Sequence, residues 1–196
     1  MNPITARRSI RKYKNTPIDK STIEHLIQYA SLAPSAKNRQ PWKFVVYLGD
    51  EKEKLTDAME KGLDRESNGK AILPDSAFGL PDAFHTLKIM KEAPVLIVVL
   101  NINGDSPYEE INTDRRISEI CDNLSIGAAI ENMLLEATKL GLGTLWIANS
   151  CFAYPELVEC VGTDDQLVSI IALGYPDECP DMRPRKSMED IIEYRE

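Results

Sequence analysis

The stretch Pro94-Val95-Leu96-Ile97-Val98-Val99-Leu100 places six apolar residues in a row after a proline. Such a run is too short for a typical helix and is rich in β-branched side chains, so it predicts a strand that is buried on both faces. A strand of this kind lies at the centre of a sheet and needs helices on each side. The run therefore predicts a layered fold of helices around a sheet.

Three other stretches have strand character, and they bring the predicted sheet to about four strands. They are residues 43–48, 144–147 and 167–173. Helical spacing predicts a helix that Asp19 caps and Pro34 stops, one from a capping pair of Asp50 and Glu53 to about Lys61, and a short one from Pro155 to about Val161. These elements do not alternate strictly, which favours an α+β fold over a doubly wound sheet.

Residues 62–85 have no sustained apolar period. This segment contains three glycines and two prolines, which are the strongest local breakers of regular structure. We therefore expect a long irregular segment here, and long loops within a domain are often functional or mobile.

The longest helical pattern runs from about Arg115 to Leu140, and its middle is apolar nearly all round. A helix of that kind needs burial on more than one side, in a core or against a partner subunit. Small residues at 125 and 127–129 would let another helix approach closely, so a symmetric dimer packed on this helix is expected. The following Gly141-Leu142-Gly143 closes a helix and precedes a strand, so we interpret it as helix termination and not as a nucleotide-binding loop.

Composition narrows the class of protein. The chain has 196 residues, 43% of them hydrophobic, which predicts a single domain over 1–196. Its net charge of −8 argues against nucleic acid as a partner. No apolar run approaches the roughly 20 residues that cross a bilayer, and residues 1–15 lack a signal-peptide core, so we expect a soluble, cytoplasmic protein without membrane contact.

Metal chemistry is not expected from the pattern of ligands. The four cysteines are widely spaced without a C-x-x-C pair, and only two histidines accompany them. We therefore expect no metal site and reduced thiols.

Two basic clusters lie near opposite ends of this acidic chain: Arg7-Arg8-Ser9-Ile10-Arg11 and Arg183-Pro184-Arg185-Lys186. The planar fork of a guanidinium matches phosphate oxygens better than an ammonium does, so the clusters suggest convergence on one phosphate. The alternative is a pair of basic segments that simply face water.

Four stretches in order resemble the flavin-dependent nitroreductase family over nearly the whole chain. They are Arg7–Arg11, Ala33-Pro34-Ser35-Ala36-Lys37-Asn38-Arg39-Gln40-Pro41-Trp42, Gly141-Leu142-Gly143-Thr144-Leu145-Trp146-Ile147-Ala148, and Leu173-Gly174-Tyr175-Pro176 before the second basic cluster. The resemblance implies a mostly antiparallel sheet of about four strands, with a strand from the partner as a possible addition. It also implies an FMN-binding homodimer, with the long helix at the interface and two sites that each use both chains.

The resemblance also implies roles for individual residues. The phosphate and ribityl end of FMN would be held by Arg7, Arg8, Ser9, Arg183 and Arg185. Arg11 would lie nearer the ring and stabilise the negative charge at its N1/O2 edge. The other subunit would contribute Pro34, Ser35, Asn38 and Gln40, and the ring would be flanked by Ile147, Ala148 and Asn149.

Three features depart from the family pattern. Ala36 stands where a second serine is common, and Ala148-Asn149 stands where Glu-Gly can occur, so a hydrogen bond at flavin N5 would come only from the backbone. The C-terminal tail is also shorter than in relatives where it wraps the partner.

The implied activity is an oxidoreductase that takes hydride from NAD(P)H and reduces nitroaromatics, quinones or a related conjugated acceptor by ping-pong kinetics. No side chain is required as nucleophile or obligatory acid, and none is predicted as catalytic. Phe78, Phe84 and Tyr108 are candidates to line the acceptor pocket, with exposed loop aromatics as the alternative. Two other functions stay open: reductive dehalogenation or flavin fragmentation on the same fold, and non-catalytic flavin storage or sensing.

Overall fold

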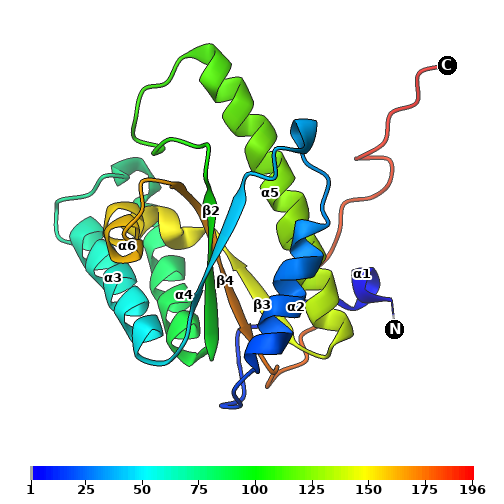
Figure 1. Cartoon of the computed structure of the whole chain (residues 1–196), viewed down its shortest axis with the longest axis horizontal. Coiled ribbons are helices and arrows are strands. Elements are labelled where there is room, and N and C mark those ends of the chain that lie inside the picture. The colour runs from blue at the N-terminus through cyan, green and yellow to red at the C-terminus, as the bar shows by residue number, and fades with distance from the viewer. Residues whose placement is uncertain (1) are drawn as a thin grey trace.

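The computed structural model describes residues 2–196 and places a four-stranded sheet between two layers of helices (Figure 1). The strands are β1 (Trp42–Tyr47), β2 (Val95–Asn101), β3 (Gly143–Ile147) and β4 (Gln166–Gly174). The helices are α1 (Pro3–Ala6), α2 (Lys20–Ser31), α3 (Gly49–Ser67), α4 (Leu80–Glu92), α5 (Thr113–Lys139) and α6 (Tyr154–Val161). Short 3-10 segments are η1 (Ala36–Asn38), η2 (Pro74–Gly79) and η3 (Asn149–Ala153). The predicted α+β class is confirmed.

β2 lies inside the sheet because both of its edges are paired. The strand order is β1-β2-β4-β3, and every neighbouring pair is antiparallel. Val98 stands opposite Val45 on one side and Ile170 on the other. All residues of β2 are buried. The predicted central strand and the predicted antiparallel sheet are therefore both confirmed.

The side chains of β2 alternate between two hydrophobic cores, because successive residues of a strand point to opposite faces. Leu96, Val98 and Leu100 pack in the core that α3, α4 and α6 cover. Ile97 and Val99 pack in the core that α2 and α5 cover. Full burial of one such side chain contributes about 1.5–3 kcal/mol, so this strand joins both helical layers to the sheet.

α5 packs into the core along one face only. Ile126, Ile130 and Met133 are fully buried against α2 and the sheet. Leu124 is 71% exposed and Ile120 is 51% exposed. The predicted long helix is confirmed, and within one chain part of its apolar surface faces outward.

The helix boundaries confirm some predicted signals and correct others. Asp19 occupies the predicted N-cap position of α2, although its side chain makes no cap hydrogen bond. The predicted capping pair of Asp50 and Glu53 is wrong, because α3 begins at Gly49 and no side chain caps it. Gly141 has a φ of 76° directly after α5, so the prediction of helix termination is confirmed.

The predicted irregular segment over 62–85 is wrong for most of its length, because α3 continues to Ser67 and both η2 and α4 follow. Pro74 and Pro81 each lie in the first turn of a helical segment, where a missing N–H costs nothing. Gly62 lies inside α3, where η3 packs so closely that a Cβ at this position would come within 2.3 Å of Ala153 Cβ. These residues mark helix starts and a close helix contact instead of a loop.

A segment near the N-terminus, residues 9–14, lies beside the segment that follows β4, residues 175–177. Ile10 N donates to Thr144 O at 2.9 Å, which sets Ser9 in a parallel bridge with β3. Beyond β4 the chain contacts the same segment, since Lys14 N donates to Tyr175 O. Residues 181–196 are all exposed. No helix among the described residues is long and apolar enough to span a membrane.

Candidate functional site

A cavity of about 130 Å³ lies where the two basic clusters meet. Its lining consists of Arg7, Arg8, Ser9, Arg11, Pro180, Asp181, Met182, Arg183 and Arg185. Two sets of backbone bonds create this meeting: the Ile10–Thr144 bond beside β3, and the bond from Asp177 N to Lys12 O at 2.9 Å. Five guanidinium groups therefore share one small cavity with a single carboxylate in its lining.

The guanidinium groups of Arg8 and Arg185 are held by backbone carbonyl groups. Arg8 NH1 donates to Thr5 O and to Arg7 O, both at 2.8 Å. Arg185 NH1 donates to Arg183 O at 2.9 Å. Because a guanidinium carries five N–H donors, each of these side chains can still bind an anion.

Arg7 forms an ion pair with α5. Its Nε atom lies 3.3 Å from Glu131 Oε1 of α5. That contact is an ion pair without hydrogen-bond geometry, and the buried Nε atom has no hydrogen-bond partner. A buried donor left without a partner is unfavourable, so the arrangement suits an additional acceptor such as a phosphate oxygen.

The predicted residues of the 34–40 stretch lie elsewhere. Pro34, Ser35, Asn38 and Gln40 do not line the arginine cavity. They form a loop around η1, and Ala36 N of this loop donates to Ser125 Oγ of α5 at 3.2 Å. Within a single chain the loop and the cavity are thus separate parts of the molecule.

The residues that follow β3 differ in what they present. Ile147 is 2% exposed and belongs to the core, so only its backbone can face a ligand. Ala148 is exposed. Asn149 Nδ2 donates to Asp82 Oδ2 at 2.8 Å and to Thr86 Oγ1 at 3.1 Å, which holds the side chain against α4.

The three aromatic candidates for an acceptor pocket are not brought together. Phe78 is 88% exposed on η2, whereas Phe84 of α4 packs against the core. Tyr108 donates to Cys151 O at 3.2 Å and meets Tyr154 edge-on at 5.7 Å between ring centroids. A separate cleft of about 740 Å³, with four carboxylates in its lining, contains both tyrosines.

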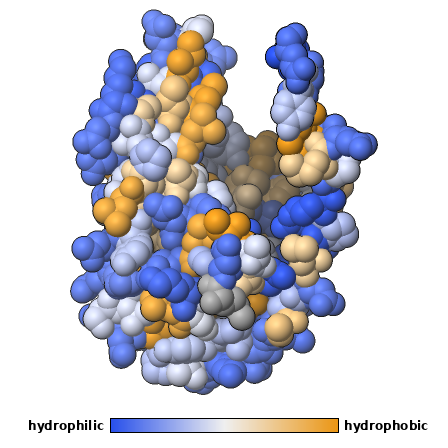
Figure 2. Space-filling view, turned by 90° about the vertical axis from the view of Figure 1, so that its right-hand side faces the viewer, coloured by the Kyte–Doolittle hydropathy of each residue, from blue (hydrophilic) through white to orange (hydrophobic). Residues whose placement is uncertain are grey.

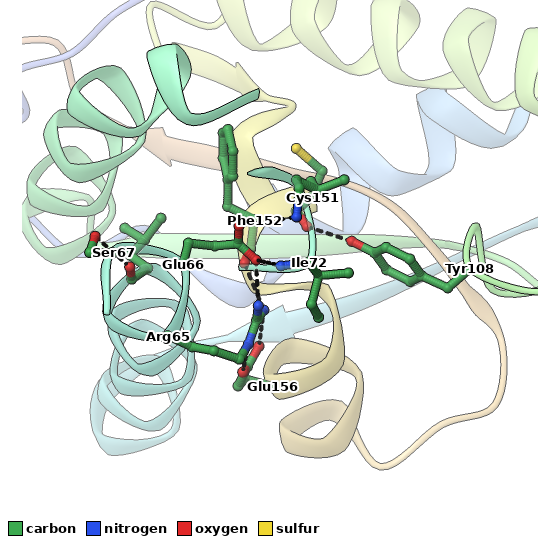
Figure 3. A network of polar contacts seen from close by, with 10 residues as sticks. Arg65, Glu66, Ser67, Ile72, Tyr108, Cys151, Phe152 and Glu156 are labelled. Atoms are coloured by element: carbon green, nitrogen blue, oxygen red, sulfur yellow. Dashed lines mark hydrogen bonds and ion pairs between the residues drawn. The ribbon is translucent and has the colours of Figure 1, made fainter. Parts of the chain in front are cut away.

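A partly buried ionic network lies beside η3, and no pattern in the sequence predicted it (Figure 3). Arg65 Nε donates to Glu156 Oε1 at 2.6 Å, and Arg65 NH2 donates to Phe152 O at 3.0 Å. Glu66 forms an ion pair with Arg65 and accepts from Ile72 N at 2.8 Å. The network joins α3, α6, η3 and the segment that precedes η2.

The pKa of Glu66 is lowered although its side chain is 1% exposed. Burial is the largest single influence and opposes ionisation, but the Ile72 N–H, the Arg65 guanidinium and the Leu73 N–H together outweigh it. Glu66 is therefore an ionised, fully bonded carboxylate, which is typical of a structural anchor.

Figure 2 shows a hollow in the side of the molecule on which Figure 1 places α1 and the C-terminal end. Apolar side chains gather along the rim of this hollow. Exposed apolar residues of α5 are Ile117, Ile120 and Leu124, and those of the tail include Met182, Met188 and Ile191. Among the described residues no group of three or more His, Cys, Asp or Glu side chains could hold a metal ion.

Comparison with known proteins identifies the family. The family model described as "Nitroreductase family" matches residues 4–175. A protein from Archaeoglobus fulgidus with the provisional name NADH dehydrogenase/NAD(P)H nitroreductase is 31% identical over 89% of this chain and 84% of its own length.

Other relatives have different enzyme names at similar distance. A 4-nitrobenzoate reductase from Nocardioides is 27% identical over 89% of this chain and 79% of its own length. An iodotyrosine deiodinase from Haliscomenobacter hydrossis is 27% identical over 96% of this chain and 85% of its own. Sequence identity alone therefore does not distinguish between these two enzyme activities.

Solved structures have the same fold. A BluB-like flavoprotein from Clostridium difficile has a TM-score of 0.75 at 26% identity, covering 99% of this chain and 97% of its own. A nitroreductase from Desulfovibrio desulfuricans, solved with FMN, has a TM-score of 0.72 at 22% identity, covering 99% and 95%. The predicted nitroreductase-like fold is confirmed.

Proposed function

Because the chain belongs to the nitroreductase family, we propose that it binds FMN and acts as an NAD(P)H-dependent oxidoreductase on a small, electron-poor acceptor. The observation that carries the proposal is the single cavity lined by Arg7, Arg8, Arg11, Arg183 and Arg185. In a chain of net charge −8, this concentration of guanidinium groups favours a local anion such as the phosphate of FMN.

The residues present fit the phosphate end of FMN. Ser9 supplies a hydroxyl, the arginines supply planar donor pairs, and Arg7 Nε is a buried donor without a hydrogen-bond partner. Arg11 would provide positive charge near the ring. A single phosphate-sized cluster favours FMN over a dinucleotide, whose binding usually needs a glycine-rich loop between a strand and a helix.

A homodimer would complete the site. The cavity of about 130 Å³ is smaller than the roughly 300–1,000 Å³ that ligand pockets usually provide. The exposed apolar face of α5 provides a surface for a second chain. In such a dimer Pro34, Ser35, Asn38 and Gln40 of one chain would contact the FMN held by the arginines of the other.

When bound, FMN would supply the redox chemistry by accepting hydride from NAD(P)H and passing electrons to the acceptor. The chain would hold the phosphate, stabilise negative charge near the ring through Arg11, and flank the ring with the backbone of residues 147–149. Phe84 is packed against the core, whereas Phe78 and Tyr108 are exposed, so Phe78 and Tyr108 are the aromatic residues proposed for acceptor contact. Nitroaromatics and quinones are the proposed acceptors.

Reductive dehalogenation is the second candidate, and the similarity to an iodotyrosine deiodinase favours testing it. That relative and the nitrobenzoate reductase are equally identical to this chain, at 27%. The two activities are separated by offering the reduced protein a nitroaromatic and a halogenated phenol in parallel.

The decisive experiment has two steps. Heat should release a yellow compound from the purified protein, with the mass and spectrum of FMN. Anaerobic mixing of the holoprotein with NADH or NADPH should then bleach the oxidised flavin absorption. A protein that retains its colour with both donors would be a flavin store or sensor, and the proposed enzymatic function would be wrong.

A further inference from the structure

The loop around η1 has an unusual backbone. Lys37, Asn38 and Gln40 have φ values of 54°, 55° and 49°, in the left-handed region that residues other than glycine rarely adopt. Such conformations persist only where the surrounding structure holds them, and they cluster at functional sites. Because all three residues are exposed, packing of their own side chains does not hold them in place.

The loop is instead fastened through Arg39, which lies among the strained residues. Arg39 Nε donates to Asp122 Oδ1 of α5 at 2.8 Å, and Arg39 NH2 lies 2.7 Å from the same oxygen. The other oxygen, Asp122 Oδ2, accepts from Asn103 Nδ2 at 3.3 Å. The Asp122 side chain is only 3% exposed, so loss of Arg39 would leave a buried charge without its cationic partner.

Two weaker sets of bonds complete the conformation. Ala36 N donates to Ser125 Oγ, one helical turn after Asp122. Inside the loop, Gln40 N donates to Ser35 Oγ at 3.0 Å and Gln40 Nε2 donates to Asn38 Oδ1 at 3.2 Å. The loop thus has a buried ionic anchor on α5 and presents a preformed polar surface outward.

We propose that Asp122, acting through Arg39, is a positioning residue that holds the 35–40 loop of one chain in the shape that receives the FMN of its partner. This inference rests on the proposed FMN-binding homodimer. α5 would then contribute to the dimer in two ways. Its exposed residues Ile120 and Leu124 would contact the partner. Its buried Asp122 would hold the loop that reaches into the partner's FMN site.

The first test compares Asp122→Asn with Glu136→Gln. Glu136 is a matched control because it is also a buried carboxylate of α5 and pairs with His25 of α2 at 2.9 Å, away from the loop. Asp122→Asn should raise the FMN dissociation constant at least 10-fold, measured by titrating apoprotein and following flavin fluorescence. Glu136→Gln should bind FMN as the wild type does, and light scattering should find both variants dimeric. Equal FMN affinity in the two variants would overturn the proposal.

The second test uses mixed dimers, because loss of a buried charge can also weaken folding. A chain with Asp122→Asn is co-expressed under a different tag with a chain that carries Arg185→Ala, and the mixed dimer is purified. One of its sites then combines both defects, while the other combines an intact loop with an intact arginine cluster. The mixed dimer should retain half of the wild-type flavin, whereas each variant homodimer should retain little.

Restored FMN binding requires that the Asp122→Asn chain is folded and that its own arginine cluster still binds the phosphate of FMN. A mixed dimer without restored binding would overturn the assignment of Asp122 to the loop that acts across the interface. Failure of the wild-type protein to bind FMN or to dimerise is a different result, which would refute the proposed function itself.

Discussion

Arg8 and Arg185 line one cavity although they lie near opposite ends of the chain. Their proximity follows from backbone bonds, because residues 9–14 pair with Thr144 on one side and with residues 175–177 on the other. A guanidinium pair fixed in this way is preorganised for an anion, since the chain has already brought the two charges together before a ligand arrives.

Arg185→Ala should weaken FMN retention. A hydrogen bond to a charged group contributes about 1.5–3 kcal/mol, which corresponds to roughly a 10-fold to 140-fold rise in the dissociation constant. Arg195→Ala is the control, because Arg195 lies in the same exposed tail and pairs only with Glu193 among the described contacts. Fluorescence titration of both apoproteins measures the difference. Equal retention in the two variants would mean that Arg185 is merely solvated.

Leu124→Glu should convert the proposed dimer into monomers and lower flavin retention with it. Leu124 is 71% exposed in the single chain, so the substitution has no core to disrupt, but an interface would have to bury its charge. Leu124→Met preserves apolar area and is the control. Light scattering at matched concentrations gives the mass, and a dimeric Leu124→Glu variant would remove α5 from the interface.

Gly62→Ala should destabilise the fold even though alanine favours helices. The new Cβ would lie 2.3 Å from Ala153 Cβ and 2.4 Å from Ala153 Cα, so α3 and η3 would have to separate. Overpacking of this kind costs about 1–3 kcal/mol. Urea unfolding should report the loss, with the exposed Lys61→Ala of the same helix as the control. A Gly62→Ala variant as stable as wild type would mean that η3 is mobile.

Stability should fall as the solution is acidified below the ordinary carboxyl pKa. The pKa values of Glu66, Glu136 and Glu156 are all lowered from 4.5 in the folded chain. Groups with a depressed folded pKa add stability above the unfolded value, and that contribution is lost as pH falls through the folded value. Thermal unfolding between about pH 7 and pH 3 tests this.

Glu66→Gln should flatten part of that acid dependence, because the neutral side chain cannot titrate. A stability profile with the same acid slope as wild type would assign the slope to other carboxylates.

The local patterns predicted those elements whose apolar period is strong. The run from Val95 to Leu100 predicted β2, and the long apolar period predicted α5, because burial leaves its mark on consecutive residues. The prediction of an irregular segment over 62–85 failed because a proline breaks a helix in its interior but is compatible with its first turn. Pro74 and Pro81 both lie in a first turn. Gly62 also counts as a breaker in that prediction, but it lies inside α3 beside Ala153, a neighbour that is far away in the sequence.

Local sequence patterns were enough to predict the sheet of four strands and the long helix, and to single out two arginine clusters and the Ser35–Gln40 stretch. The packing of the folded chain was needed to show that Arg8 and Arg185 share a cavity, that Asn149 donates to Asp82, and that Arg39 contacts the buried Asp122. The physical reason is one of range. Periodicity and turn chemistry act between neighbours along the chain, whereas ion pairs and cavities depend on strand register and helix packing, which no local pattern specifies.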